Sequence, residues 1–230
     1  MHAGTHSLTY KTSDQDVLQA GDVSSRTPLT YSSSEALPGT LQLHSTRAAL
    51  TDTFSNTCES GVFSCRPATG EISSLSCEPC PGHEVVVSLF EVEYSAAAVT
   101  AFIEREHEFR FVAVTPFTLD GQQLDGHRAV ICAKNTDEHY RATRCPQAEF
   151  ERRWGQYGVD RVWRDDVLPC RVYLRHCVLA AQSFCPEAYN SFLDNTFLAD
   201  RSTTVRQYLE LHPEIMQELP PNELVQRYNG

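Results

Sequence analysis

The sequence predicts an α+β fold in which a small mixed β-barrel is flanked by helices, with further helices toward the C-terminal end. Runs rich in β-branched and aromatic residues come first, between residues 62 and 134, and helix signals dominate after Pro146. The chain has 230 residues, of which 41% are hydrophobic, so it contains enough apolar material for a core.

Two regions differ in composition. Residues 1–60 are rich in Ser, Thr, Asp and Gly and show no sustained periodicity, so we predict a loop-rich segment that can contribute a first strand and a substrate loop. Residues 61–230 form the predicted domain, and no linker divides residues 61–212.

Individual elements follow from local signals. Strands are predicted at residues 62–65, 84–93, 109–117 and 128–134, where β-branched or aromatic residues run between turn signals. Ser95 can cap a helix over residues 96–106 by accepting a hydrogen bond from the first turn. Later helices are predicted at residues 147–157, 169–183, 186–194 and 202–212. Pro169 and Pro186 suit first-turn positions, where a missing N–H costs nothing.

The charge balance limits the partners. Thirty acidic and nineteen basic residues give a formal charge of −11, which repels phosphate backbones and anionic membranes. No apolar run approaches the ~20 residues that a membrane helix needs, and the first residues lack the pattern of a secretory signal. We therefore expect a cytoplasmic protein with neither nucleic acid nor a membrane as partner. The sequence carries no signal for the oligomeric state.

Nine cysteines, odd in number and scattered, do not form a disulfide framework. A zinc module at Cys58, Cys65, Cys77 and Cys80 is one hypothesis, but the first pair is spaced too widely for a zinc ribbon. A thioredoxin-like redox pair at Cys77 and Cys80 is disfavoured because no strand is predicted directly before it. We therefore predict no metal and no cofactor.

The densest ionisable cluster is Glu104-Arg-Glu-His-Glu108, at the junction of a predicted helix and strand. A solvated helix end is the simpler interpretation, and His107 is expected at the surface. Glu106, however, can point over the edge of the sheet toward Phe102, Phe109 and Phe111. Such a position would partly desolvate the carboxylate, as a general base requires.

Three stretches resemble motifs of the γ-glutamylcyclotransferase-like superfamily, in the correct order. Ile103-Glu-Arg-Glu-His-Glu-Phe-Arg-Phe-Val-Ala-Val-Thr115 is similar to its D/E-x-R-E-x-x-Y-x-R-x-x-V stretch. Cys80-Pro-Gly-His-Glu-Val-Val-Val-Ser-Leu-Phe-Glu-Val92 is similar to its PGxxVxGxLYEV strand, and Leu168-Pro-Cys-Arg-Val-Tyr-Leu174 to its PSxxYL helix start. The resemblance covers roughly residues 61–212.

The resemblance implies an enzyme that releases 5-oxoproline from a small γ-glutamyl compound, such as glutathione or a γ-glutamyl amino acid or amine. The α-amine of the substrate attacks its own γ-carbonyl and closes a five-membered lactam. By motif match, Glu106 takes the amine proton and returns it to the leaving nitrogen. Ring closure supplies proximity, so neither a metal nor a covalent enzyme intermediate is required.

Family members hold the substrate with a Tyr-Gly-Ser-Asn/Leu loop near the N-terminus, and this chain departs from that pattern. The nearest match is Tyr31, Ser32, Ser33 and Ser34, with Ser32 in the place of glycine. The stretch Tyr10-Lys-Thr-Ser13 is a weaker match.

Tyr173 can place its hydroxyl in the pocket by motif match. Alternatively, Tyr173, Cys177, Ala180 and Phe184 form the core face of a helix. Because the glycine loop is missing, a catalytically inactive relative that acts as a binding or interaction protein is the alternative function.

Overall fold

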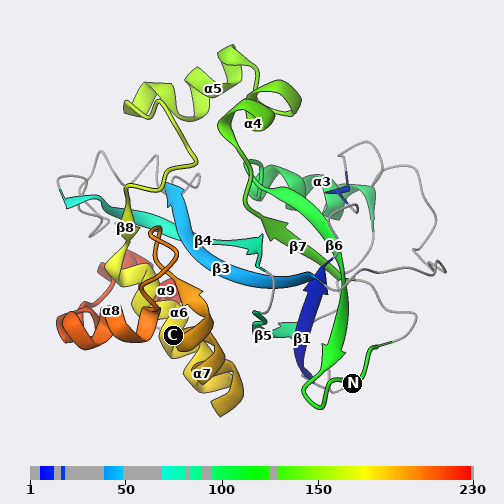
Figure 1. The fold of residues 1–230 in the computed structure, drawn as a ribbon. Coiled ribbons are helices and arrows are strands. Elements are labelled where there is room, and N and C mark those ends of the chain that lie inside the picture. The colour runs from blue at the N-terminus through cyan, green and yellow to red at the C-terminus, as the bar shows by residue number, and fades with distance from the viewer. Residues whose placement is uncertain are drawn as a thin grey trace.

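The computed structural model describes residues 6–12, 17–18, 39–48, 69–80, 83–89, 95–124 and 129–228 (Figure 1). The strands in this part of the chain are β1 (His6–Thr12), β2 (Val17–Leu18), β3 (Gly39–Ala48), β4 (Glu71–Pro79), β5 (Val86–Leu89), β6 (Arg110–Thr118), β7 (Ala129–Ala133), β8 (Leu168–Pro169) and β9 (Thr196–Phe197). The helices are α3 (Ala96–Arg105), α4 (Asp137–Thr143), α5 (Gln147–Arg153), α6 (Arg171–Phe184), α7 (Pro186–Asn195), α8 (Val205–Leu211) and α9 (Val225–Tyr228), with 3₁₀ turns η2 (Gly155–Tyr157), η3 (Pro213–Gln217) and η4 (Asn222–Leu224).

The strands form one curled, mixed sheet that resembles half of a barrel (Figure 1). Its order is β2-β6-β7-β4-β3-β1-β5, with β8 added to β4 and β9 added to β3. Strand β6 is central, because it pairs antiparallel with β7, β1 and β2. Strands β4 and β7 run parallel and meet where Cys77 lies opposite Ala133. The predicted α+β class and the curled sheet flanked by helices are confirmed.

Part of the N-terminal segment belongs to this sheet. Strands β1, β2 and β3 all lie within residues 1–60 and pair with β4, β5 and β6. In the register of β2 with β6, Val17 lies opposite Val112 and Leu18 opposite Phe111. The chain therefore leaves β2 beside the beginning of β6, where the preceding helix α3 also ends.

Several local signals act as predicted. The Ser95 side chain caps α3 by accepting a hydrogen bond from the N–H of Ala98, with an N···O distance of 3.1 Å. Pro186 is the first residue of α7. The helix predicted at residues 202–212 is α8, and it begins with a capping box that was not predicted, in which the side chains of Thr204 and Gln207 each accept from the backbone of the other.

Other predictions differ from the structure. The strand predicted at residues 62–65 lies outside the described residues. Pro169 does not begin a helix: it pairs with Ser73 of β4, and α6 starts after the N-cap Cys170. Strand β4 was not expected, yet it contains Cys77, so a strand does lead into the Cys77–Cys80 pair.

Helix α4 was also missed, although it carries a start signal. Thr136 accepts a hydrogen bond from the His139 N–H, and the first turn contains Asp137 and Glu138. Among the described helices, none combines the length and the apolar character that a membrane span requires.

Strand β6 separates two clusters of buried side chains, because successive residues of a strand point to opposite faces. Val112 and Val114 contact residues of β7 and of the chain around β5. Phe109 and Phe111 instead pack in a cluster with side chains of α4, α5 and the loop that follows: Tyr140, Cys145, Phe150, Trp154, Val162 and Trp163. A third cluster joins the C-terminal helices.

Candidate functional site

Glu106 lies at the C-terminal end of α3, directly before β6. Its backbone N–H donates to the Phe102 carbonyl, with an N···O distance of 2.9 Å, and this bond ends the helix. The Glu106 carbonyl accepts from the Phe109 N–H at 3.1 Å and closes a turn. We refer to residues 106–109 as the Glu106 turn.

The Glu106 carboxylate is partly sheltered, with 24% of its side chain exposed. Its Oε1 accepts a hydrogen bond from Arg105 Nε at 3.0 Å. The Arg105 guanidinium lies over the Phe102 ring, 5.5 Å from its centroid, and the Phe102 and Phe111 rings are 5.3 Å apart. The carboxylate is therefore held by Arg105 at the end of α3 while it remains accessible from solvent, as proton exchange with a small molecule requires.

His107, expected at the surface, is half-buried. Its Nδ1 lies 2.8 Å from the Tyr140 hydroxyl, and that hydroxyl also accepts a hydrogen bond from Trp154 Nε1 at 3.1 Å. Burial, and then the nearby charge of Arg153, lower the pKa of His107 below its ordinary value. The imidazole is therefore neutral at neutral pH.

The rest of the charged run divides between solvent and core. Glu104 is exposed and pairs with Arg153 of α5. Hydrogen bonds from Arg152 and Arg153 lower the pKa of the neighbouring Glu149 to about 2. Glu108, by contrast, is buried. The interpretation as a solvent-exposed helix end therefore holds for Glu104, but it does not hold for the residues of the Glu106 turn.

Tyr173 belongs to another part of the molecule. It lies on α6, among the helices of the third core cluster, and its side chain hydrogen-bonds to Cys177 one turn later. Figure 1 shows α3 and α6 on different sides of the curled sheet. The structure therefore does not bring Tyr173 beside Glu106.

The predicted substrate loop of Tyr31, Ser32, Ser33 and Ser34 lies outside the described residues. The weaker match begins in β1, where the backbone of Tyr10 pairs with Pro116 of β6. Strand β1, which contains the first three residues of this stretch, therefore runs antiparallel to β6, the strand that follows Glu106. The substrate-binding roles of these residues stay predictions.

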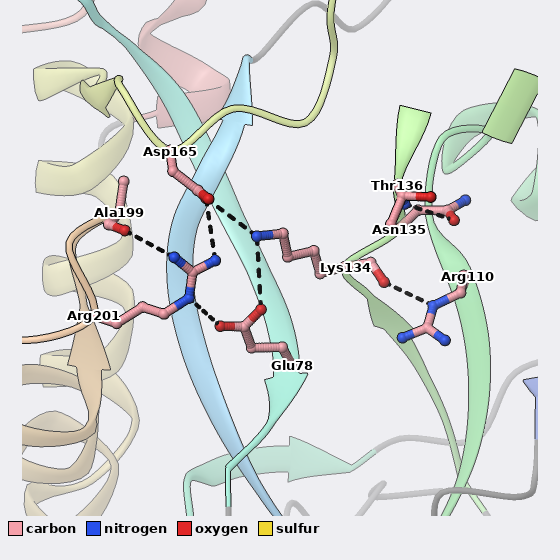
Figure 2. Close-up of polar contacts among 8 residues, drawn as sticks. All are labelled: Glu78, Arg110, Lys134, Asn135, Thr136, Asp165, Ala199 and Arg201. Atoms are coloured by element: carbon pink, nitrogen blue, oxygen red, sulfur yellow. Dashed lines mark hydrogen bonds and ion pairs between the residues drawn. The ribbon is translucent and has the colours of Figure 1, made fainter. Parts of the chain in front are cut away.

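Figure 2 shows a cluster of four charged side chains that the sequence analysis did not find. Arg201 donates to Glu78 at 2.8 Å and to Asp165 at 3.1 Å, and Lys134 lies 3.2 Å from Asp165 and 3.7 Å from Glu78. Burial alone would raise the pKa of Asp165, but hydrogen bonds from Arg201 and Lys134 outweigh it and hold the pKa below its usual range.

This charge cluster is a structural connection between the sheet and the C-terminal helices. Its members come from β4, the end of β7, the loop before β8 and the turn after β9. Arg201 adopts a left-handed backbone conformation with φ of 57°, which a non-glycine residue holds only when its surroundings enforce it. The Lys134 carbonyl accepts from Arg110 Nε at 2.8 Å, which ties the cluster to the start of β6.

The zinc hypothesis stays untested. Cys58 and Cys65 lie outside the described residues, and within the described ranges no group of three His, Cys, Asp or Glu residues could hold a metal ion. Burial raises the pKa of the Cys77 thiol to about 12, and burial followed by the charge of Glu78 raises the pKa of Cys80.

We expect the Cys77 and Cys177 thiols to resist alkylation in the folded protein. Burial raises both pKa values to about 12, so only about 10⁻⁴ of each thiol is thiolate at pH 8. Peptide mass spectrometry after treatment with iodoacetamide at pH 8 should find both residues unmodified, whereas the same treatment in denaturant should modify them fully. Equal modification with and without denaturant would contradict the burial of these thiols.

Comparisons of the chain with protein-family models, with curated proteins and with solved structures found no match.

Proposed function

We propose that this protein is a γ-glutamylcyclotransferase-like enzyme that releases 5-oxoproline from a small γ-glutamyl compound, with Glu106 as its general acid and base. The observation that carries the proposal is the position of Glu106. Its carboxylate is partly sheltered and is oriented by Arg105, and Glu106 begins a backbone turn in which both its own N–H and its carbonyl are hydrogen-bonded.

The chemistry needs one proton acceptor. The α-amine of the substrate has a pKa of roughly 7.7–8.0, so much of it is protonated at neutral pH and cannot attack. In the proposed reaction Glu106 accepts the amine proton, the nitrogen forms a bond to the γ-carbonyl carbon, and the amide bond to the leaving amine breaks. Glu106 then gives this proton to the leaving nitrogen, which restores the carboxylate. The ring nitrogen loses its second excess proton to solvent, and the freed amine takes up one proton from solvent.

The arrangement of the N-terminal strands supports a substrate site at this end of the sheet. The backbone of Leu18 in β2 pairs with that of Phe111, two residues after the Glu106 turn. Strand β2 therefore ends beside the start of β6, the strand that follows Glu106. We propose that the segment that follows β2, which contains Tyr31, Ser32, Ser33 and Ser34, supplies hydrogen-bond donors for the carboxylate of the substrate.

The direct test is a product assay on the full-length protein. γ-Glutamyl-alanine, glutathione and a γ-glutamyl amine are incubated with the enzyme, and 5-oxoproline is measured by mass spectrometry. At least one of them should yield 5-oxoproline together with the free amine in equal amounts. N-acetyl-γ-glutamyl-alanine is the matched control, because its blocked nitrogen cannot attack. Release of alanine from this control would indicate hydrolysis and contradict lactam formation.

The replacement of the family's glycine by Ser32 favours a second candidate function, a binding protein that has lost catalysis. A side chain in a left-handed backbone position carries a steric penalty that glycine avoids. If no substrate yields 5-oxoproline, titration with 5-oxoproline and glutamate, followed by NMR, distinguishes the two. Shifts at the amides of the Glu106 turn would then support a binding protein, and their absence would exclude both functions.

A further inference from the structure

The Glu106 turn is held from one side by the segment that begins at Asn135 and continues through α4. The three carbonyls that follow Glu106 all accept hydrogen bonds from this segment. Arg144 Nη1 donates to the Phe109 carbonyl at 2.8 Å and to the His107 carbonyl at 3.4 Å. Asn135 Nδ2 donates to the Glu108 carbonyl at 3.1 Å. The backbone of the turn is therefore fixed at successive residues.

Tyr140 adds a contact to a side chain of the turn. Its hydroxyl is 2.8 Å from His107 Nδ1, and the two rings pack edge to face with centroids 5.5 Å apart. Tyr140 lies in α4, and Arg144 directly follows that helix, where its N–H donates to the Tyr140 carbonyl at 3.0 Å. Tyr140 is fully buried, and its hydroxyl also accepts from Nε1 of Trp154, the residue after α5.

These donors are themselves fixed in place. Asn135 is buried, and its Oδ1 accepts from the Thr136 N–H at 2.9 Å, which sets the direction of the amide (Figure 2). The Arg144 guanidinium lies over the Phe111 ring, 4.5 Å from its centroid. Burial lowers the pKa of Arg144, yet the group stays charged. A half-buried charged donor on a backbone carbonyl forms a strong and directional bond.

We propose that Asn135, Tyr140 and Arg144 form a clamp of positioning residues that orients Glu106 for proton transfer. This inference rests on the proposed function. The three residues act through the backbone of the Glu106 turn and through His107. Their proposed role is to position Glu106, and none of them is assigned a part in the chemical step. Because proton transfer depends on the direction of the carboxylate, a small rotation of the turn is expected to affect turnover more than substrate binding.

The test compares Arg144→Ala with the wild-type protein in the 5-oxoproline assay. We expect kcat to fall by about 10- to 100-fold, while KM changes little. Guanidinium ion at low, non-denaturing concentration should restore part of kcat, because it can occupy the space of the missing side chain and donate to the same carbonyls. Tyr140→Phe keeps the ring and should lower kcat by a smaller factor. Arg161→Ala, at an exposed position, is the matched control and should neither lose activity nor respond to guanidinium.

A second measurement separates the clamp from the reaction. Hydrogen exchange of the Phe109 amide, whose N–H closes the Glu106 turn, should be faster in Arg144→Ala than in the wild-type protein, with circular dichroism confirming that the variant is folded. Full kcat or unchanged exchange in the folded variant would overturn the clamp. An inactive wild-type protein would instead overturn the proposed function and with it the catalytic role of the clamp, whatever the exchange shows about the turn.

Discussion

Replacement of Glu106 by glutamine is expected to slow the release of 5-oxoproline by about 10²- to 10⁴-fold, the usual contribution of a general acid–base group. Glutamine has the same shape and can still accept a hydrogen bond from Arg105, so the turn should keep its structure. It cannot take a proton from the α-amine of the substrate. The effect should therefore appear in kcat, with a smaller change in KM, when γ-glutamyl-alanine is titrated against wild-type and variant protein.

The control for this substitution is Glu210→Gln on α8. Glu210 is exposed, so the same chemical change there should leave turnover unaltered. Glu106→Asp, which keeps the carboxylate but moves it, should retain more activity than Glu106→Gln. Equal rates for wild type and Glu106→Gln would remove Glu106 from the reaction, and with it the central element of the proposed mechanism.

Arg171→Met is expected to destabilise the protein by about 3–5 kcal/mol, the range for breaking a buried ion pair from one side. The Glu71 side chain is only 4% exposed, and its Oε1 lies 2.5 Å from Arg171 Nε. Its other oxygen accepts from the Thr69 hydroxyl at 2.7 Å. Without Arg171 the buried carboxylate would lose this ion pair, at the junction of β4 and α6.

The free energy of unfolding in urea measures this effect. The destabilisation should appear as a lower free energy of unfolding of the variant at pH 7. The matched control is Arg206→Met. Arg206 pairs with the half-exposed Asp194, so this substitution should lower the free energy of unfolding by about 1 kcal/mol or less. A loss of equal size for both variants would show that the buried pair has no special role.

Elements with complete local signals could be predicted from the sequence. Helix α3 starts after Ser95 because a hydroxyl there satisfies a free N–H, and α7 starts at Pro186 because that position needs no donor. The apolar run of β6 likewise indicates a strand that is buried on both faces. The location of Glu106 between α3 and β6 follows from these signals alone.

Strand β4 and its neighbour β8 could not be predicted in this way. β4 buries Ser73, Ser74 and Ser76, which read as a polar loop in the sequence. Their burial depends on pairing with β3 and β8, whose residues lie far away along the chain. The same pairing places Pro169 in a strand, although its local pattern suits a helix start.

The sequence by itself determined that Glu106 lies between a helix and a strand. Helix capping and the alternation of side chains along a strand depend only on residues that are close in the sequence. Only the tertiary structure decided what surrounds the Glu106 carboxylate. Arg144 and Asn135 reach the Glu106 turn from 27 to 37 residues away, and Arg171 reaches Glu71 from 100 residues away. Hydrogen bonds of this kind form when packing brings distant segments together, and no local pattern of residues encodes their geometry.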